Sequence, residues 1–599
     1  MVSKVWFRKK NSESGYDLRP VNAPRLSGTA LRWAPWILQL PGIRQIFVLS
    51  TFWNLGLYRF RRFSTHHAPR FQPLAPIPAA APSAEEAARS VQIFQDFFLN
   101  TTRKSVGWVE ERDPASPAGE EEPEEPRQFA PETAADFARA YRSGRITPLQ
   151  VAQRLLDVLQ NLEGSAVPLR PLVAWEEEDL LEQARASTQR FAEEKPLGFW
   201  DGVPCAIKDE FHLRGFPTQV GCRLFSADPV NLDSEVVRRL RESGALLIGK
   251  AHMHELGMGV TGVSTADGVA RNPHDPERYP GGSSSGCAVS VSVGLCPLAL
   301  GADAGGSIRV PSSLCGVVGL KPTWGRVTPQ DKVHLGWTVG HVGPLGASVG
   351  DVALGYAQIA GPCEQDPWSQ LQPPVTLPDP EKPVPDGVRL GLFSDWFSDA
   401  DPEVLSACSE AVSWLEQQGL SRNSIRLPSL EMLRSALLVT VLSEMAACAE
   451  EVGSFWRGAG PDARINLNLS QELSAEDYLR AQRIRQFWLE KMEVLFRKVD
   501  VLVTPTTAIT APRIPEDVHL AGESDLPTTT RLMQYVLMPN LTGYPALSVP
   551  VGYDSSGMPI GLQLIARPWE EDLLLGLGLR LEEFLQKKQP MRHYRLLSQ

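Results

Sequence analysis

Two short apolar runs separated by a helical segment constrain the fold of this chain more than any other feature. VPCAIK (203–208) and ALLIGK (245–250) have the length and composition of strands that are buried on both faces. SEVVRRLRESG between them has the spacing of an amphipathic helix. Similar signals alternate from about residue 130 onward: the helical segments ETAADFARAYRSG and PLQVAQRLLDVLQNLE, and the strand-like runs VDVLVTPT, ALSVPVG and IGLQLIA. This order predicts one large α/β domain.

The first 70 residues differ in charge from the rest of the chain. They hold twelve Lys and Arg residues against only Glu13 and Asp17, a net charge of +10. The whole chain carries −11, so the remainder carries −21. A basic terminus on an acidic body is attracted to an anionic surface, and a membrane is the obvious one. The negative overall charge argues against a nucleic-acid partner.

Residues 36–63 form a long apolar stretch that Pro41 and Arg44 interrupt. Its charge-free part, 45–58, has 14 residues, whereas a membrane-spanning helix needs about 20. Aromatic residues and flanking arginines are typical of a helix that lies in the membrane interface. The alternative is a helix packed on the protein's own body, but the basic flanks favour the membrane. The sequence therefore predicts a helical, membrane-associating extension over residues 1–70.

A linker is predicted over residues 71–129. QPLAPIPAAAPSA (72–84) is rich in Pro and Ala and is expected to be extended. EERDPASPAGEEEPEEP (110–126) is an acidic, proline-broken run that predicts a solvated loop. The main domain is then expected to span residues 130–590.

The eight cysteines show no C-x-x-C spacing, and most lie in apolar runs. This pattern predicts buried, reduced thiols in an intracellular protein. The amino terminus also lacks the layout of a secretory signal peptide.

Three short motifs suggest chemistry that their surroundings do not support. GALLIGKA (244–251) fits a phosphate loop except for the Ala after its Lys, but its apolar middle favours burial. His252 and His254 have the spacing of a metal pair without a third ligand, which favours structural or substrate-lining histidines. GSSSG (282–286) fits a nucleophile elbow centred on Ser284, but a loop precedes it where that fold requires a strand.

The segment GADAGGSIRVP (301–311) presents a better nucleophile, Ser307. Two glycines before it allow a tight turn in which successive N–H groups point the same way and can hold an oxyanion. The residues after Ser307 predict a short helix, whose positive end favours negative charge nearby. A serine hydroxyl still needs a base. Lys208 at the end of VPCAIK could accept a proton if buried and neutral, or it could instead form a salt bridge to Asp209 or Glu210.

Taken together, Lys208, GGSSSG (281–286) and Asp303–Ser307 resemble the amidase signature family. The resemblance continues through GLKPTWGR, VLVTPTT and PALSVPVGYDSSGMPIGLQL, and covers about residues 130–590. It implies a single large domain with a mixed, largely parallel twisted sheet covered by helices. It also implies Ser–cis-Ser–Lys catalysis, with Ser307 as nucleophile, Ser283 as bridge after a cis peptide bond, and Lys208 as base.

By the same resemblance, backbone N–H groups of Ala304, Gly305, Gly306 and Ser307 form the oxyanion hole. Ser284 and Ser285 would support the loop through hydrogen bonds. The amide would be cleaved through an acyl-enzyme that water hydrolyses, with no metal and no organic cofactor.

KAHMHELGMGVTG and RNPHDPERYPGGSSSG resemble the plant-type fatty acid amide hydrolase branch of the family. This implies hydrolysis of fatty acid amides such as N-acylethanolamines, in lipid degradation, by a homodimer. It also implies substrate contacts from Ser283 and from His254, Glu255, Leu256 and Gly257. With the basic extension, it places the protein on an intracellular membrane surface, such as the endoplasmic reticulum or another endomembrane. A small-amide amidase, the glutaminase subunit of an aminoacyl-tRNA amidotransferase, and an inactive lipid-binding scaffold are the alternatives.

Overall fold

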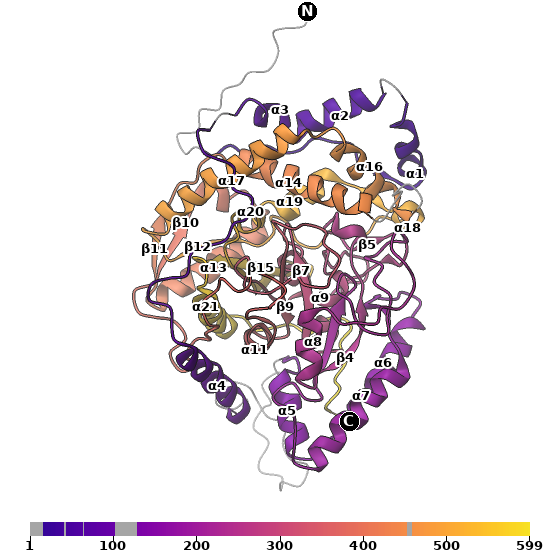
Figure 1. Ribbon diagram of the computed structural model, residues 1–599, viewed down its shortest axis with the longest axis vertical. Coiled ribbons are helices and arrows are strands. Elements are labelled where there is room, and N and C mark those ends of the chain that lie inside the picture. The colour runs from indigo at the N-terminus through magenta and orange to yellow at the C-terminus, as the bar shows by residue number, and fades with distance from the viewer. Residues whose placement is uncertain (1–15, 41–42, 64, 102–128, 452–457, 599) are drawn as a thin grey trace, which may run out of the picture.

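An eleven-stranded mixed sheet forms the centre of the molecule (Figure 1), in the order β11-β10-β12-β15-β14-β8-β9-β7-β3-β4-β2. The computed structural model describes residues 16–40, 43–63, 65–101, 129–451 and 458–598. The strands of the sheet are β2 (Leu172–Ala174), β3 (Pro204–Lys208), β4 (Leu246–Ala251), β7 (Leu298–Asp303), β8 (Val318–Lys321), β9 (His341–Gly346), β10 (Arg389–Leu392), β11 (Ser421–Ser424), β12 (Val501–Pro505), β14 (Ala546–Tyr553) and β15 (Pro559–Ile565).

The apolar runs of the sequence form the strands predicted for them. VPCAIK and ALLIGK form β3 and β4, which are fully buried and parallel, and α8 (Glu235–Glu242) connects them. Because β4 is a buried strand, the Lys of GALLIGKA does not lie in a phosphate loop: Lys250 forms an ion pair with Asp209 at 2.9 Å.

The sheet is mixed, as predicted, but less parallel than expected. Of the ten pairs of neighbouring strands in the described sheet, four are parallel and six are antiparallel. A tight turn at 554–557 joins β14 to β15, and tight turns permit only antiparallel pairing. Apolar composition reports burial and not strand direction, so the sequence pattern could not separate the two cases.

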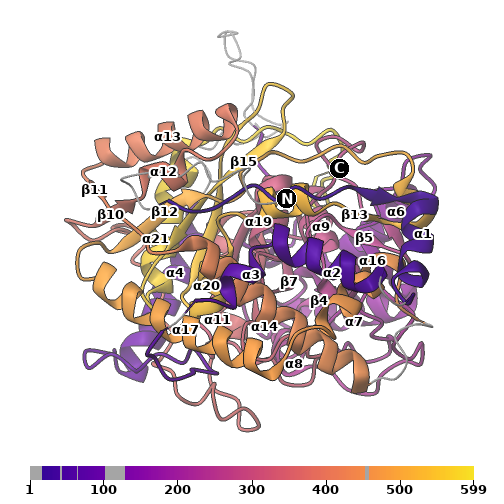
Figure 2. The ribbon, with the colours of Figure 1, turned by 90° about the horizontal axis from the view of Figure 1, so that it is seen from above.

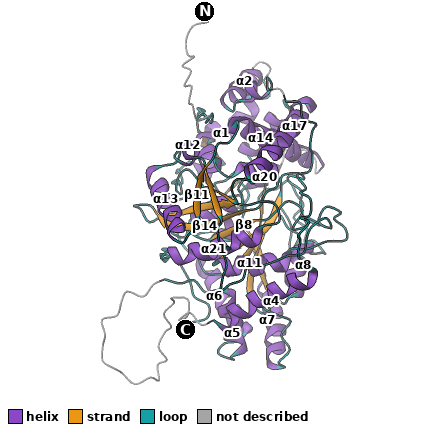
Figure 3. Cartoon of the chain, turned by 90° about the vertical axis from the view of Figure 1, so that its left-hand side faces the viewer, coloured by secondary structure: helices purple, strands orange, loops and turns teal. Residues whose placement is uncertain are grey.

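Helices surround the sheet (Figure 3). Their starts follow from local chemistry. Thr133 and Thr147 each form a capping box, with Asp136 and Gln150, before the two helices predicted first. The helices around the sheet are α5 (Ala134–Arg142), α6 (Pro148–Glu163), α7 (Glu177–Ala192), α9 (Ser285–Ser292), α10 (Arg309–Cys315), α11 (Val349–Ile359), α12 (Ser394–Phe397), α13 (Pro402–Gln417) and α21 (Glu571–Phe584).

A second group of helices lies at one end of the sheet (Figures 1 and 2). It consists of α14 (Leu430–Glu451), α16 (Pro461–Ser470), α17 (Ala475–Leu495), α18 (Val518–Ala521), α19 (Leu526–Met533) and α20 (Leu537–Thr542). Among the described residues, Leu430–Ala449 of α14 is the one helical segment whose length and composition would suit a membrane crossing. In this fold, 67% of its apolar window is buried, and α14 packs against α16, α17 and α20 as a core helix.

The amino-terminal helices α1 (Gly28–Ile37), α2 (Ile43–Asn54) and α3 (Leu57–Phe60) lie on the outside of this second group (Figure 2). Polar contacts hold them there. β1 (Leu26–Ser27) pairs with β13 (Glu523–Ser524), and Arg61 forms an ion pair with Asp477 at 2.7 Å. The described part of the extension is therefore helical over 28–37, 43–54 and 57–60, as predicted, and it packs on the body.

Part of the predicted linker is a helix. Residues 84–100 form α4 (Ala84–Asn100), which starts at a Ser83–Glu86 capping box and buries Phe94 completely against the body. The Pro/Ala-rich stretch before α4 has no helix or strand, as expected. The acidic run 110–126 lies outside the described residues.

Candidate active site

Lys208, Ser283 and Ser307 come from three segments that meet at one edge of the sheet. Lys208 is the last residue of β3, and Ser307 follows the end of the neighbouring strand β7 by four residues. β3 and β7 are parallel, so their carboxyl ends lie at the same edge. Ser283 lies in the loop before α9, and all three residues are buried.

The amine of Lys208 has three partners. Its Nζ lies 2.9 Å from Ser283 Oγ, 3.2 Å from the carbonyl oxygen of Ala302 and 2.9 Å from Glu210 Oε2. The two alternatives for Lys208 are therefore both present: it bonds to Ser283 and pairs with Glu210. Asp209, the other acidic candidate, pairs with Lys250 instead.

Ser283 lies on a loop that the neighbouring serines fasten. The peptide bond between Gly282 and Ser283 is cis, as the resemblance implied. Ser284 Oγ donates to the carbonyl of Ala302 at 3.2 Å, and Ser285 Oγ donates to the carbonyl of His252, also at 3.2 Å. The Ser284 N–H donates to the carbonyl of Ser307 at 3.1 Å, which joins the Ser283 loop to the Ser307 loop.

The glycine loop before Ser307 is shaped by Asp303. Its carboxylate accepts bonds from the Gly306 N–H at 2.6 Å and from the Ile308 N–H at 3.1 Å. It also takes two bonds from the Arg309 guanidinium, at 2.9 and 3.0 Å, and one from Asn540 at 2.9 Å. Burial alone would raise the pKa of Asp303, but Arg309 and these donors outweigh it and hold the pKa well below its usual range.

The backbone conformation at position 306 requires a glycine. Its φ is +107°, and an added Cβ would lie 2.4 Å from Val536 Cγ2. Its N–H is occupied by Asp303, although the resemblance assigned this group to the oxyanion. The N–H groups of Ala304, Gly305 and Ser307 remain the candidates for that role.

His254 and Glu255, predicted to contact substrate, use their side chains inside the protein. His254 Nδ1 accepts the N–H groups of Gly262 and Val263, each at 3.2 Å. Burial lowers the pKa of His254 to about 3, so the ring is neutral. The Glu255 carboxylate accepts bonds from the Gly460 N–H and the Thr265 hydroxyl, both at 2.6 Å.

Leu256 and Gly257 lie closer to the serines. Leu256 has a positive φ of 52°, and its N–H donates to the carbonyl of Val220. A Cβ built on Gly257 would lie 3.6 Å from Ser283 Oγ. Of the four predicted contacts in this segment, two therefore lie directly at the serine: Gly257, and His254, whose N–H donates to the carbonyl of Ser283 at 3.0 Å.

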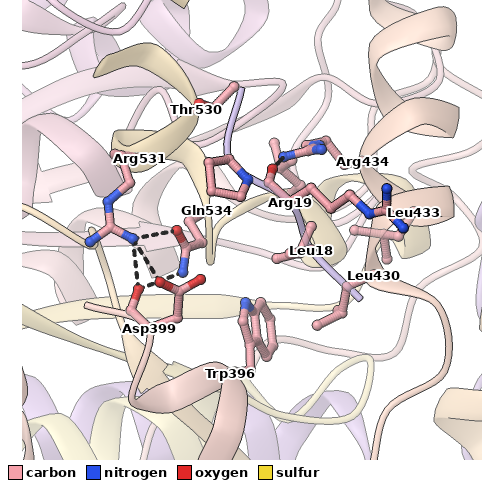
Figure 4. A pocket seen from close by; sticks show the side chains of 12 residues that line it. Leu18, Arg19, Trp396, Asp399, Leu430, Leu433, Arg434, Thr530, Arg531 and Gln534 are labelled. Carbon is pink, nitrogen blue, oxygen red and sulfur yellow. Dashed lines mark hydrogen bonds and ion pairs between the residues drawn. The ribbon is translucent and has the colours of Figure 1, made fainter. Parts of the chain in front are cut away.

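A small cavity of about 60 Å³ lies elsewhere, between the amino-terminal segment, α14 and α19 (Figure 4). Its lining includes Arg19 and Arg434, and Arg531, which bonds to Asp399 at 3.0 Å. Lys208, Ser283 and Ser307 are not among its lining residues. The cavity belongs to the packing of the amino-terminal segment on the body.

Sequence reasoning missed the buried charges that support the site. The sequence pattern places Asp303 in a motif but does not identify it as the anchor of the glycine loop. Arg309, Glu210 and Lys332 had no assigned role in catalysis, yet Lys332 Nζ lies 2.5 Å from Glu210 Oε1. The available signal was a charged residue inside an apolar stretch, as Arg309 is in SIRVPSSLC.

This chain is similar to proteins of known family over most of its length. The amidase family model matches residues 156–575. The chain belongs to the amidase signature family. It is 40% identical to fatty acid amide hydrolase of Arabidopsis thaliana over 77% of this chain and 78% of that protein. It is 37% identical to fatty acid amide hydrolase of Oryza sativa subsp. japonica over 97% and 96%.

Two further proteins are similar to this chain over about three quarters of its length. A glutamyl-tRNA(Gln) amidotransferase subunit from Symbiobacterium thermophilum is 36% identical over 74% of this chain and 94% of that protein. A crystal structure of an amidase superposes with a TM-score of 0.67 and 29% identity, over 75% of this chain and 99% of the other. This chain is therefore an amide-hydrolysing enzyme with the α/β fold of its family.

Proposed function

We propose that this amidase hydrolyses fatty acid amides, including N-acylethanolamines, with Ser307 as nucleophile, Ser283 as proton bridge and Lys208 as base. The observation that supports the mechanism best is the 2.9 Å contact between Lys208 Nζ and Ser283 Oγ, in a loop bonded directly to that of Ser307. The substrate class is supported by the plant relatives, which are named as fatty acid amide hydrolases.

The proposed reaction begins with two proton transfers. Neutral Lys208 takes the proton of Ser283, which takes the proton of Ser307 as the Ser307 oxygen attacks the amide carbonyl carbon. The oxyanion is stabilised by the N–H groups of Ala304, Gly305 and Ser307. The C–N bond then breaks, and the amine leaves with a proton returned from Lys208 through Ser283. Water repeats the sequence on the acyl-enzyme and releases the fatty acid.

Apolar side chains border Ser283, the proposed proton bridge. A Cβ on Gly257 would meet Ser283 Oγ, Leu335 Cδ1 and Met445 Cε within 3.8 Å, so these three side chains surround one point. Leu335 and Met445 belong to a buried apolar cluster with Val220, Met253 and Cys448. An acyl chain suits such surroundings at about 0.8 kcal/mol per buried CH₂, whereas the polar side chain of glutamine does not.

The helix that carries Met445 also contacts the amino-terminal helices. α14 contacts α3, and near its start the Ser435 hydroxyl donates to the carbonyl of Leu55. α1 and α2 expose Trp33, Trp36 and Trp53, between 51% and 62% each, together with Ile43, and the segment between the two helices exposes Leu40. We therefore propose that α1 and α2 dock on an endomembrane and that the acyl chain passes from the bilayer along α14 to Ser307.

A substrate panel tests the proposed activity. We expect the purified chain to release amine from a long-chain N-acylethanolamine at least about a hundredfold faster, by kcat/KM, than from acetamide or glutamine, because apolar contacts favour long chains. The measurement is the initial rate of amine release at matched subsaturating substrate. Preference for glutamine would favour the function for which the amidotransferase relative is named. If the protein turns over none of these amides and is not labelled covalently by a serine-directed phosphonate, the result would favour an inactive lipid-binding scaffold.

Membrane docking is tested by removing the exposed tryptophans. An aromatic side chain of about 200 Å² that is half exposed can transfer about 100 Å² into a bilayer, worth about 2.5 kcal/mol. The triple variant Trp33→Ser, Trp36→Ser, Trp53→Ser is therefore expected to bind anionic liposomes at least about a hundredfold more weakly in a flotation assay. Short soluble amides should still be cleaved at the normal rate.

The matched control is Trp368→Ser, which removes a tryptophan that is 42% exposed outside the extension and should leave liposome binding unchanged. Normal flotation of the triple variant would contradict docking through α1 and α2.

The homodimer implied by the resemblance is part of the same proposal. Light scattering of the detergent-free protein should give twice the mass of one chain.

A further inference from the structure

The carboxylate of Glu210 lies between two buried lysines. Its Oε2 is 2.9 Å from Lys208 Nζ, and its Oε1 is 2.5 Å from Lys332 Nζ. All three side chains are almost completely buried. Lys332 is held in place: its Nζ donates to the carbonyl of Val333 at 3.0 Å, and the Val333 N–H donates to the carbonyl of Glu210 at 3.1 Å. The three residues therefore form a fixed row, with the carboxylate between the two lysines, and the row ends at Ser283.

The partners of Lys208 dictate how a neutral amine would be oriented. A neutral amine has two N–H donors and one lone pair. Glu210 and the Ala302 carbonyl can only accept, so the two N–H groups must face them. Among the described contacts of Nζ, Ser283 is the one that carries a proton. The lone pair then faces the Ser283 hydroxyl, which is the orientation that proton transfer requires.

The charge of Glu210 creates a conflict that Lys332 resolves. A carboxylate 2.9 Å away, taken alone, would stabilise the ammonium form of Lys208 and weaken it as a base. Burial by itself would raise the pKa of Glu210, but the cation of Lys332, 2.5 Å away, favours the ionised carboxylate. Glu210 is thus ionised, and the positive charge of Lys332 offsets it. The pair Glu210–Lys332 is neutral and can direct the Lys208 amine without holding its proton.

Resting on the proposed role of Lys208 as base, we propose that Glu210 is a positioning residue that aims the Lys208 lone pair at Ser283, and that Lys332 is the counter-charge that lets Lys208 be neutral. Neither residue touches the substrate in this proposal. Both act through Lys208.

The other titratable groups around this row are neutral or already paired. Burial lowers the pKa of His254 to about 3 and that of His334 to about 4, and it raises the pKa of Cys287 to about 12. The remaining charged neighbours are paired with each other: Asp209 with Lys250, and Asp303 with Arg309. Among the described residues, Glu210 is the carboxylate within ion-pair distance of Lys208, and Lys332 is the second lysine that pairs with it.

The test compares two single variants of opposite sign. The acid limb of the pH profile of kcat/KM reports the pKa of the base in the free enzyme. Glu210→Gln leaves the charge of Lys332 unopposed beside Lys208, which disfavours the ammonium, so the acid limb should move down by at least about one pH unit. Lys332→Gln leaves Glu210 unopposed, so the limb should move up by a similar amount. The double variant restores neutrality, and its limb should return to within about half a unit of wild type.

Rates are measured on the full chain with a long-chain N-acyl p-nitroanilide, and thermal unfolding is followed in parallel. Lys382→Gln removes an exposed lysine from its pair with Asp386 and should leave the profile unchanged. If a single variant does not fold, the double variant and the other single variant still give the comparison. Acid limbs that do not separate, or that move in the same direction, overturn the inference. Activity that survives in Lys208→Met overturns the proposed function instead.

Discussion

Replacing Ser307 with alanine is expected to reduce kcat by roughly 10⁴-fold or more, because the variant loses the atom that forms the acyl-enzyme. Residual turnover would come from binding and the oxyanion N–H groups alone. The same variant should lose all covalent labelling by a serine-directed phosphonate, which reports the nucleophile independently of the natural substrate. The two measurements are the initial rate of amine release and the mass of the intact labelled chain.

A matched control for this variant lies in α9. Ser290 is fully buried, and its Oγ has no hydrogen-bond partner in the described part of the chain. Ser290→Ala should therefore keep both labelling and turnover. Lys208→Met should also lose turnover, because no base remains for the relay. Phosphonate label that persists on Ser307→Ala, or turnover that stays at the wild-type level in either Ser307→Ala or Lys208→Met, would contradict the assignment.

Much of the fold follows from patterns that burial imposes on sequence. A strand covered on both faces has to be apolar throughout, so β3 and β4 can be predicted within one or two residues. Helix starts are encoded locally by capping residues such as Thr133 and Thr147. Strand direction depends on the path of the connections, and α4 was missed because it follows a proline-rich stretch that predicts extended chain.

The candidate site was predictable where chemistry leaves a local signature. Glycines beside Ser283 and Ser307 mark tight turns that only glycine allows, and all eight cysteines are buried, as their apolar surroundings predict. Electrostatic partners leave no such signature. Glu210 and Lys332 are 122 positions apart and meet only in the folded chain. The inward orientation of the His254 and Glu255 side chains could not be predicted either, because their hydrogen-bond partners lie on other loops.

The ion pair that supports the glycine loop carries the second large prediction. Arg309 and Asp303 are both fully buried, and the arginine also donates to Gln563 and Asn540. Arg309→Met would leave a buried carboxylate without its counter-charge, which costs about 3 to 5 kcal/mol. We expect a loss of that size in the free energy of unfolding at pH 7, measured by urea denaturation, together with loss of activity as the loop before Ser307 relaxes.

The pH dependence of this loss follows from the sign of the Asp303 shift. In the wild-type protein the pKa of Asp303 is lowered, so its contribution to stability is present above its unfolded pKa of about 3.9 and is lost as the pH falls. Without Arg309, burial raises the pKa of Asp303. As the pH falls, Asp303 is therefore protonated at a higher pH in the variant than in the wild-type protein. The stability gap between the two proteins should therefore be largest near pH 7 and should narrow toward pH 4.

The loss of stability in Arg309→Met is expected to come from the unpaired charge of Asp303 and not from lost packing alone. The double variant Asp303→Asn, Arg309→Met carries no buried charge at this point and should be more stable at pH 7 than Arg309→Met, although it has lost more native groups. Arg580→Met breaks an exposed pair with Glu583 and should change stability by less than about 1 kcal/mol. A double variant no more stable than the single one would mean that Asp303 does not need Arg309 as its counter-charge. The glycine loop would then depend on the shape of its surroundings rather than on this ion pair.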